Sequence, residues 1–298
     1  GPPCALPAWR ERGQPRRRAM STGWAMPPEP PPPRVTPRGW LRVLRRGAPL
    51  AVVVFGGLAV LLTLRLVERP LYGLHRPLTP RITQAVCRTA LAIIGLGYEV
   101  RGERMQQRGA VVANHASWLD IFVLNAGKRV YFVSKSEVAR WPLIGWLARA
   151  TGTVFIDRDP RAARAQTALF VARLMAGHKL LFFPEGTSTD GRVVLPFKPT
   201  LFEAFFRAGL REALRVQPAT VVYHAPPGAD ARFYGWWGEM DFGRHLLKVL
   251  AAPRQGRVEV IYHAPVRVAD FADRKALAAH AEATVRAGMP PDRQAPPG

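Results

Sequence analysis

The sequence predicts an α/β domain whose sheet is mixed or largely parallel and flanked by helices, preceded by an N-terminal pair of membrane-anchoring helices. After residue 98, short apolar runs alternate with longer segments of helical periodicity, which is typical of a sheet covered by helices. Before that point, residues 48–64 are uncharged and mostly apolar. A chain of 298 residues is long enough for one such domain with a substantial core.

Changes in composition suggest the domain boundaries. Residues 1–47 carry ten arginines, two glutamates and an unbroken proline run, so we expect a disordered tail. Met20 and Met26 are both candidate natural start sites, because the chain does not begin with methionine. Membrane anchoring is expected from residues 48–97, a catalytic domain from residues 98–288, and a second disordered tail from residues 289–298.

The anchor region contains two apolar segments. Residues 48–64 would span roughly 26 Å as a helix, near the lower limit for a bilayer core of about 30 Å. The second segment, residues 82–98, is interrupted by Arg88 and is typical of an interfacial or re-entrant helix. Both flanks of the first segment are basic, which favours a hairpin with both flanks on the cytoplasmic side over one clean crossing. A buried helix pair in a soluble protein is the alternative.

Strands and helices of the catalytic domain are expected to alternate after the first two strands. Strands are predicted at 98–101, 110–113, 129–133, 153–156, 179–183, 216–223 and 258–262. Helices are predicted at 117–126, 141–150, 162–176, 200–208, 242–250 and 274–287. Pro218 lies inside the sixth strand and indicates an edge strand or a bulge. Trp141 and Trp146 predict a membrane-facing loop and helix, since tryptophan prefers the bilayer interface.

Charge and cysteine content limit the possible partners. The chain has 43 Lys plus Arg against 21 Asp plus Glu, a formal net charge of +22, which implies an anionic partner. Cys4 and Cys87 match no metal or redox spacing, so we expect no metal site. The sequence has no helix-turn-helix, zinc or RNA-binding signature, so we expect no nucleic-acid partner. A non-catalytic basic protein that binds acidic membranes or nucleic acid is an alternative from another class.

A histidine and an aspartate follow the strand at 110–113. His115 lies at the carboxyl end of that strand, where open α/β sheets place their chemistry, and Asp120 follows five residues later. Asp120 can orient the imidazole, which leaves the other ring nitrogen free to accept a proton from a hydroxyl group. The alternative for this pair is a histidine with a purely structural role, hydrogen-bonded beside a capped helix. Ser117 is expected to be the N-cap of that helix.

Two further segments end apolar strands on charged residues, 152–158 and 182–188. With the segment 114–120 and the proline of the sixth strand, they resemble the glycerolipid acyltransferase family over roughly residues 98–265. The likeness is closest to the bacterial 1-acylglycerol-3-phosphate O-acyltransferase type. It implies the glycerolipid acyltransferase fold and the transfer of an acyl group from a thioester to a lysolipid hydroxyl, giving phosphatidic acid. The absence of a G-x-S-x-G elbow in the sequence counts against the other enzyme alternative, a lipid hydrolase.

The resemblance also implies roles for individual residues. His115 would be the general base and Asp120 its orienting partner. Glu185 would hold the polar head of the acceptor, and Gly186 would let the backbone turn. The substrate-binding residues it implies are Lys135, Arg158, Glu185, Gly186, Thr187 and Lys198.

One departure from the family pattern bears on the acceptor. Most relatives carry an arginine after the threonine, whereas Ser188 follows Thr187 here, and Lys198 would supply the missing charge. The segments Thr-Asp-Gly at 189–191 and Leu-Pro-Phe-Lys at 195–198 resemble the branch of the family that acylates lyso-ornithine lipid. That zwitterionic acceptor, which has no phosphate, is the leading alternative substrate. No cofactor is expected, with acyl-CoA or acyl carrier protein as the co-substrate. The expected location is the bacterial inner membrane, with the catalytic domain on its cytoplasmic face among membrane lipids.

Overall fold

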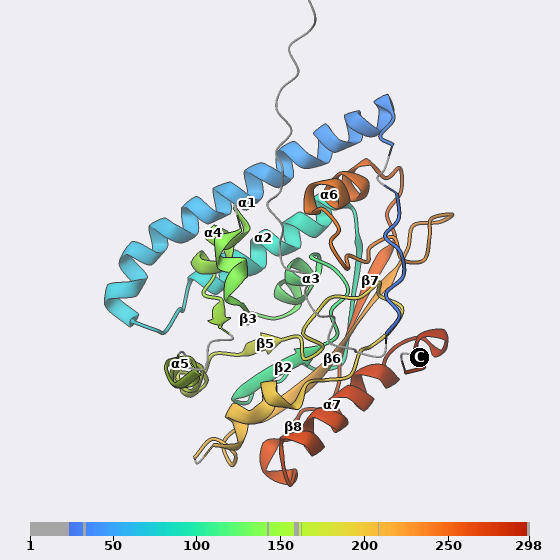
Figure 1. Cartoon of the computed structure of the whole chain (residues 1–298). Coiled ribbons are helices and arrows are strands. Elements are labelled where there is room, and N and C mark those ends of the chain that lie inside the picture. The colour runs from blue at the N-terminus through green and yellow to red at the C-terminus, as the bar shows by residue number, and fades with distance from the viewer. Residues whose placement is uncertain are drawn as a thin grey trace, which may run out of the picture.

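The computed structural model describes residues 24–31, 34–141, 143–157, 161, 163–207 and 209–296. These residues build an eight-stranded sheet in the order β1-β7-β6-β2-β5-β3-β4, with β8 paired to β6 (Figure 1). The strands are β1 (Gly97–Arg101), β2 (Gly109–Ala113), β3 (Tyr131–Lys135), β4 (Val154–Ile156), β5 (Leu180–Phe182), β6 (Arg215–His224), β7 (Arg257–Tyr262) and β8 (Val266–Arg267).

The sheet is mixed and largely parallel, which confirms the predicted fold class. Strands β6, β2, β5, β3 and β4 run parallel to one another. Strand β7 runs antiparallel to β6, and β1 is parallel to β7. The carboxyl ends of β2, β5, β3 and β4 therefore meet at one edge, and the loops that follow them can bring their side chains together.

Helices cover both faces of this sheet. The α-helices are α1 (Pro37–Tyr72), α2 (Thr79–Ile94), α3 (Asp120–Gly127), α4 (Ile144–Ala150), α5 (Ala163–Met175), α6 (Phe242–Ala251) and α7 (Arg274–Ala287). The 3-10 turns are η1 (Ser136–Arg140), η2 (Pro199–Phe206), η3 (Val268–Asp270) and η4 (Pro291–Arg293). Alternate residues of β2 serve two cores: Val111 faces the core under α2, α3 and α6, whereas Val112 faces the core under α5, η2 and α7.

Helix α1 begins well before the predicted anchor. It starts at Pro37, and the hydroxyl of Thr36 accepts the backbone N–H of Gly39 at 3.1 Å as an N-cap. Arg42 and Arg46 donate hydrogen bonds to carbonyls at the C-terminal end of α6. The prediction that residues 1–47 are disordered is therefore wrong for residues 37–47, because these arginines bind unsatisfied helix carbonyls. Residues 1–23 lie outside the described part.

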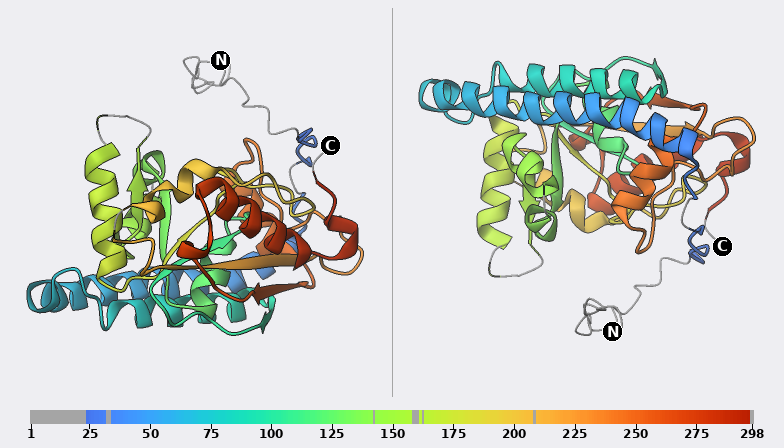
Figure 2. Two further views of the ribbon diagram at one scale, coloured as in Figure 1. Left: turned by 90° about the horizontal axis from the view of Figure 1, so that it is seen from below. Right: turned by 90° about the horizontal axis from the view of Figure 1, so that it is seen from above.

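Helices α1 and α2 lie side by side and antiparallel along one side of the molecule (Figures 1 and 2). The carboxylate of Glu68 in α1 accepts the N–H groups of Leu78 and Thr79, which caps the start of α2. Arg88, the charge that interrupts the second apolar segment, donates its Nε–H to the carbonyl of Ala126 at 2.9 Å. That bond ties α2 to the C-terminal end of α3, so the hairpin is joined to the catalytic domain.

Pro218 lies in an interior strand, so the prediction of an edge strand is wrong. Strand β6 pairs with β2 on one side and with β7 and β8 on the other. Pro218 falls between the β8 pairing, which ends at Val216, and the β7 pairing, which starts at Ala219. The missing N–H of proline therefore falls where the antiparallel partner changes, and the sheet loses no ladder bond there.

The C-terminal end is folded as far as it is described. Met289 is 2% exposed, and Arg293 is 8% exposed and donates to the carbonyl of Tyr223 at 2.8 Å. The prediction of a disordered tail from residue 289 is therefore wrong for the segment that contains η4. A single buried arginine and a methionine in a proline-rich stretch are too weak a pattern to reveal this packing from the sequence.

Candidate active site

The site begins where strand β2 stops. The β2–β6 ladder ends at Ala113, and the side chain of Asn114 then continues it. The Asn114 amide donates to the carbonyl of Val221 at 2.9 Å, and its oxygen accepts the N–H of Val221 at 2.8 Å. A side chain thus replaces one step of backbone pairing. The main chain is free to leave the sheet and carry His115 away from β6.

Asp120 is completely buried and organises the segment before it. Its Oδ2 accepts Nδ1 of His115 at 2.7 Å, the N–H of Ala116 at 2.9 Å and the N–H of Ser117 at 3.1 Å. Helix α3 starts at Asp120 itself, not at Ser117. The predicted helix start is therefore three residues too early, but Ser117 still has a capping contact, because its hydroxyl accepts the N–H of Leu119 at 3.3 Å in the turn that leads into α3.

The contact with Asp120 decides the tautomer of His115. An ionised carboxylate only accepts, so Nδ1 carries the proton and Nε2 is the basic nitrogen. The imidazole is stacked on the ring of Phe183, with centroids 4.1 Å apart and planes 13° apart. Its side chain is 20% exposed, and His115 lines the main cavity of the described structure. The pair predicted from the sequence is therefore assembled as a general base requires.

Glu185 holds the backbone of the site. It is fully buried, its Oε1 accepts the N–H of His115 at 2.6 Å, and its Oε2 accepts the N–H of Leu195 at 2.7 Å. Burial raises the pKa of Glu185 to about 8, the nearby charge of Asp120 adds to the rise, and the two N–H bonds oppose it. With no exposed surface, this carboxylate does not reach an acceptor head group, contrary to the expectation from the sequence.

Two predicted lysines meet at the turn that follows Glu185. Gly186 has φ +74°, and Nζ of Lys135 donates to its carbonyl at 2.8 Å. The positive φ favours glycine at this turn, and a Cβ at Gly186 would lie 2.5 Å from Nζ of Lys198, so the ammonium group of Lys198 lies directly against Gly186. Thr187 is exposed beside them. The structure therefore brings Lys135, Gly186, Thr187 and Lys198 together, whereas Arg158 lies outside the described residues.

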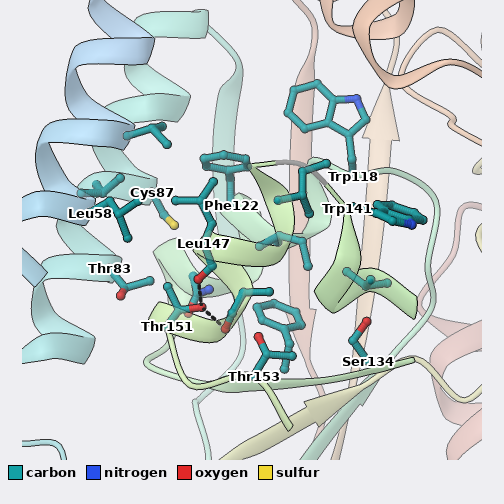
Figure 3. Close-up of a pocket in the computed structure, with 18 of the residues that line it drawn as sticks. Leu58, Thr83, Cys87, Trp118, Phe122, Ser134, Trp141, Leu147, Thr151 and Thr153 are labelled. Carbon is teal, nitrogen blue, oxygen red and sulfur yellow. Dashed lines mark hydrogen bonds between the residues drawn. The ribbon is translucent and has the colours of Figure 1, made fainter. Parts of the chain in front are cut away.

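An apolar cavity of about 320 Å³ runs from His115 between the anchor helices and the catalytic domain. Leu58 of α1 and Cys87 of α2 line it on one side, and Trp118 and Trp141 line it on another (Figure 3). Burial in this lining raises the pKa of the Cys87 thiol to about 12, so it stays a neutral, apolar wall group. The cavity suits an extended hydrocarbon chain whose reacting end lies at His115.

The two predicted membrane-facing tryptophans differ in their surroundings. Trp141 is 42% exposed and lines the cavity, and its ring meets that of Trp236 edge-on. Trp146 is 61% exposed on α4.

Within the described ranges, no group of three or more His, Cys, Asp or Glu side chains is placed to hold a metal ion.

Sequence reasoning missed Tyr223. Its hydroxyl donates to Oδ1 of Asp120 at 2.6 Å although the two residues are 103 positions apart. Tyr223 is the last residue but one of the apolar strand β6 and belongs to no short motif, so no local signal distinguishes it from a core tyrosine. Asn114 begins the segment 114–120 that resembles the family, but its pairing with Val221 depends on strand order, which a single sequence does not reveal.

Comparison with known proteins extends the likeness beyond these residues. Residues 97–222 match the Acyltransferase family. The chain is similar to a lyso-ornithine lipid O-acyltransferase of Rhodobacter capsulatus, with 60% identity over 88% of this chain and 95% of that protein. A 1-acyl-sn-glycerol-3-phosphate acyltransferase of Neisseria gonorrhoeae is 31% identical over 71% of this chain and 82% of that protein. The crystal structure of PlsC, the LPA acyltransferase of Thermotoga maritima, has the same fold, with a TM-score of 0.60 and 22% identity over 84% of this chain and 94% of that chain.

Proposed function

Because this chain belongs to the acyltransferase family and acts on lysolipids, we propose that its acceptor is lyso-ornithine lipid and its product ornithine lipid. The observation that carries this proposal is the 60% identity with a lyso-ornithine lipid O-acyltransferase over 95% of that protein. From the motifs alone we expected 1-acylglycerol-3-phosphate first. Similarity to the Neisseria enzyme keeps that lipid as the second candidate acceptor.

The proposed chemistry needs one base and no cofactor. Nε2 of His115 takes the proton of the acceptor hydroxyl, whose oxygen attacks the carbonyl carbon of the thioester. The carbon–sulfur bond then breaks, and the imidazolium returns its proton to the departing thiolate. Asp120 keeps Nδ1 protonated throughout and stabilises the transient positive charge, as in the hydrolase triads. Acyl-CoA or acyl carrier protein supplies the thioester, and the apolar cavity receives the acyl chain.

The lysine pair beside Gly186 would contact the head of the acceptor. An ornithine head carries a carboxylate and an ammonium group but no phosphate. Lys135 and Lys198 present two ammonium groups at the edge of the sheet where His115 lies, so they would bind that carboxylate through charge-assisted hydrogen bonds. The buried Glu185 would not contact the ammonium group. Arg158 remains a predicted phosphate contact for the second candidate acceptor.

One set of assays tests the acceptor and the lysine pair together. Purified protein is assayed with acyl-CoA and with acyl carrier protein against lyso-ornithine lipid, its carboxyl methyl ester and lysophosphatidate. We expect the highest kcat/KM with lyso-ornithine lipid and a loss on the order of tenfold with the ester, because charged hydrogen bonds disappear. The double variant Lys135→Gln/Lys198→Gln should treat the acid and the ester alike. Lys275→Gln, an exposed lysine on α7, is the matched control.

The outcomes separate the two parts of this proposal. Turnover of lysophosphatidate without turnover of lyso-ornithine lipid would reject the acceptor. Turnover of lyso-ornithine lipid with the same loss on the ester in the wild type and in the double variant would reject the lysine contact alone. Either donor can fail without affecting these two conclusions.

We infer that the chain binds the membrane with α1 in the plane of the interface. By length and composition α1 could cross a membrane, and its 36 residues make about 54 Å of helix. It nevertheless packs on α6 near its start and on α2 and α4 further along, which suits a helix lying flat on the domain. Val52 and Leu66, 72% and 77% exposed, project apolar groups from its free face. The proposed location is the bacterial inner membrane, with the catalytic domain on the cytoplasmic side.

Washing membranes with high salt tests this arrangement. Apolar burial is insensitive to screening, so the protein should stay in the pellet and leave it only with detergent. Release by salt alone would reject the apolar anchor. Protease added outside intact spheroplasts should leave residues 98–298 uncut, and cleavage there would reject the cytoplasmic side.

A further inference from the structure

Each oxygen of the Asp120 carboxylate has its own set of partners. Oδ2 binds the imidazole of His115 and two backbone N–H groups. Oδ1 accepts the hydroxyl of Tyr223 at 2.6 Å, and that hydroxyl is its one hydrogen-bond donor among the described residues. Tyr223 lies just beyond the part of the chain that matches the family, residues 97–222.

The backbone around Tyr223 is fixed from three directions. The Asn114–Val221 pair joins β6 to the end of β2 two residues earlier. The guanidinium of Arg293, in the C-terminal turn η4, donates to the carbonyl of Tyr223 at 2.8 Å. The ring of Tyr234 lies 5.6 Å from that of Tyr223, centroid to centroid. Tyr223 itself is 4% exposed, and its hydroxyl donates to Oδ1 of Asp120.

A buried carboxylate oxygen without a donor is costly. Loss of a hydrogen bond to a buried charged group is unfavourable, and the carboxylate can rotate to reduce that cost. Rotation about the Cβ–Cγ bond would move Oδ2 away from Nδ1 of His115. Burial and the charge of Asp120 raise the pKa of Tyr223 well above its ordinary value, so its hydroxyl remains a donor at every working pH.

We propose that Tyr223 is a positioning residue for acyl transfer: its hydroxyl fixes the plane of the Asp120 carboxylate, and through it the tautomer and direction of His115. Arg293 supports it by holding the Tyr223 carbonyl, so the C-terminal turn η4 contributes to the reaction although it touches no substrate. This proposal rests on the proposed roles of His115 and Asp120.

The test compares Tyr223→Phe with Tyr234→Phe. Both changes remove one buried hydroxyl and keep the ring, and the hydroxyl of Tyr234 bonds only Gln255 and the N–H of Gly256 among the described contacts. Tyr223→Phe should lower kcat on the order of tenfold and leave KM for donor and acceptor within about twofold. Tyr234→Phe should keep kcat. The two variants should lose similar melting temperature.

The pH profile adds a readout that a structural role would not move. The charged or titratable groups around His115 are Asp120 from α3, Glu185 after β5 and Tyr223 from β6. Without the phenol, the Asp120 carboxylate can rotate, its Oδ2 moves away from Nδ1 of His115, and the imidazolium loses part of its stabilisation. The acid limb of kcat/KM should therefore shift to lower pH in Tyr223→Phe, by about half a unit. The limb should not shift in Tyr234→Phe.

A second variant keeps the test decisive if Tyr223→Phe folds poorly. Arg293→Met preserves most of the buried side-chain volume and removes only the donor to the Tyr223 carbonyl. It should lower kcat about twofold to fivefold and shift the same limb in the same direction. Normal kcat and an unmoved limb in both variants would overturn the proposal. A His115→Ala variant that keeps its activity would instead reject the proposed base, which is a different failure.

Discussion

Asp120 and Glu185 are two buried carboxylates at neighbouring strand ends with different partners. Both have 0% exposure, and both accept backbone N–H groups from residues 115–117. Asp120 also bonds two side chains, the imidazole of His115 and the phenol of Tyr223. Among the residues that the structure describes, Glu185 bonds only backbone, at His115 and Leu195. The first carboxylate controls a group that can move a proton, and the second fixes where the chain runs.

The difference teaches that a motif predicts where an acid lies better than what it does. Both acids follow an apolar strand, and both were predicted to serve the reaction. What separates their roles is whether the partner atom is titratable, and that depends on contacts between β2, β5 and β6. Substitutions at the two acids and at the residues they bind should therefore differ in their effects on kcat and on stability.

The largest effect is expected at the base. His115→Ala and Asp120→Ala should each lower kcat on the order of 10²-fold or more, since general-base catalysis is lost. His280→Ala, an exposed histidine on α7, should leave kcat unchanged. Initial rates of thiol release from acyl-CoA measure all three variants. Near-normal turnover of His115→Ala would remove the basis for separating the two acids.

Glu185→Gln should have an intermediate effect, mainly through structure. The amide nitrogen cannot accept a hydrogen bond, so the N–H of either His115 or Leu195 loses its partner. We expect the free energy of unfolding to decrease by about 1–3 kcal/mol. We also expect a decrease in kcat that is much smaller than the decrease in His115→Ala. Urea denaturation followed by circular dichroism gives the first quantity, and steady-state rates give the second. Loss of all turnover at unchanged stability would assign Glu185 to the chemistry after all.

The same acid should give the stability a pH dependence. Burial raises the pKa of Glu185 from 4.5 to about 8, so the folded protein holds this proton more strongly than the unfolded chain does. Its contribution is complete below about pH 4.5 and is lost as the pH rises through about 8. The melting temperature of the wild type should therefore fall between about pH 4.5 and 8 more steeply than that of Glu185→Gln, because over this range the unfolded chain loses the proton while the folded protein keeps it. Parallel curves for the two proteins would show that Glu185 is already ionised at neutral pH.

How well the sequence predicts the fold and the site depends on how far apart along the chain the interacting residues lie. The alternating patterns predicted strands β1 to β7 to within a few residues, and the five-residue spacing predicted the His115–Asp120 contact, because both signals are local. The start of α1, the buried Glu185 and the Tyr223 hydroxyl all depend on partners far along the chain. Arg46, for example, bonds Leu250, which is 204 residues away. No local pattern specifies such a partner.

The smallest expected effect extends the comparison to the arginines of α1. Arg45 and Arg46 are adjacent, but Arg45 is exposed, whereas Arg46 is 8% exposed and donates to the carbonyls of Leu250 and Ala252 at the end of α6. Arg46→Met should therefore lower the free energy of unfolding by about 1–2 kcal/mol, because two carbonyls lose a charged donor. Arg45→Met should stay within about 0.5 kcal/mol of the wild type. Urea denaturation of both variants in the same detergent measures the difference. Equal values would mean that the arginines before residue 47 act as a solvated charge, as their composition alone suggested, and that the contact with α6 adds nothing to stability.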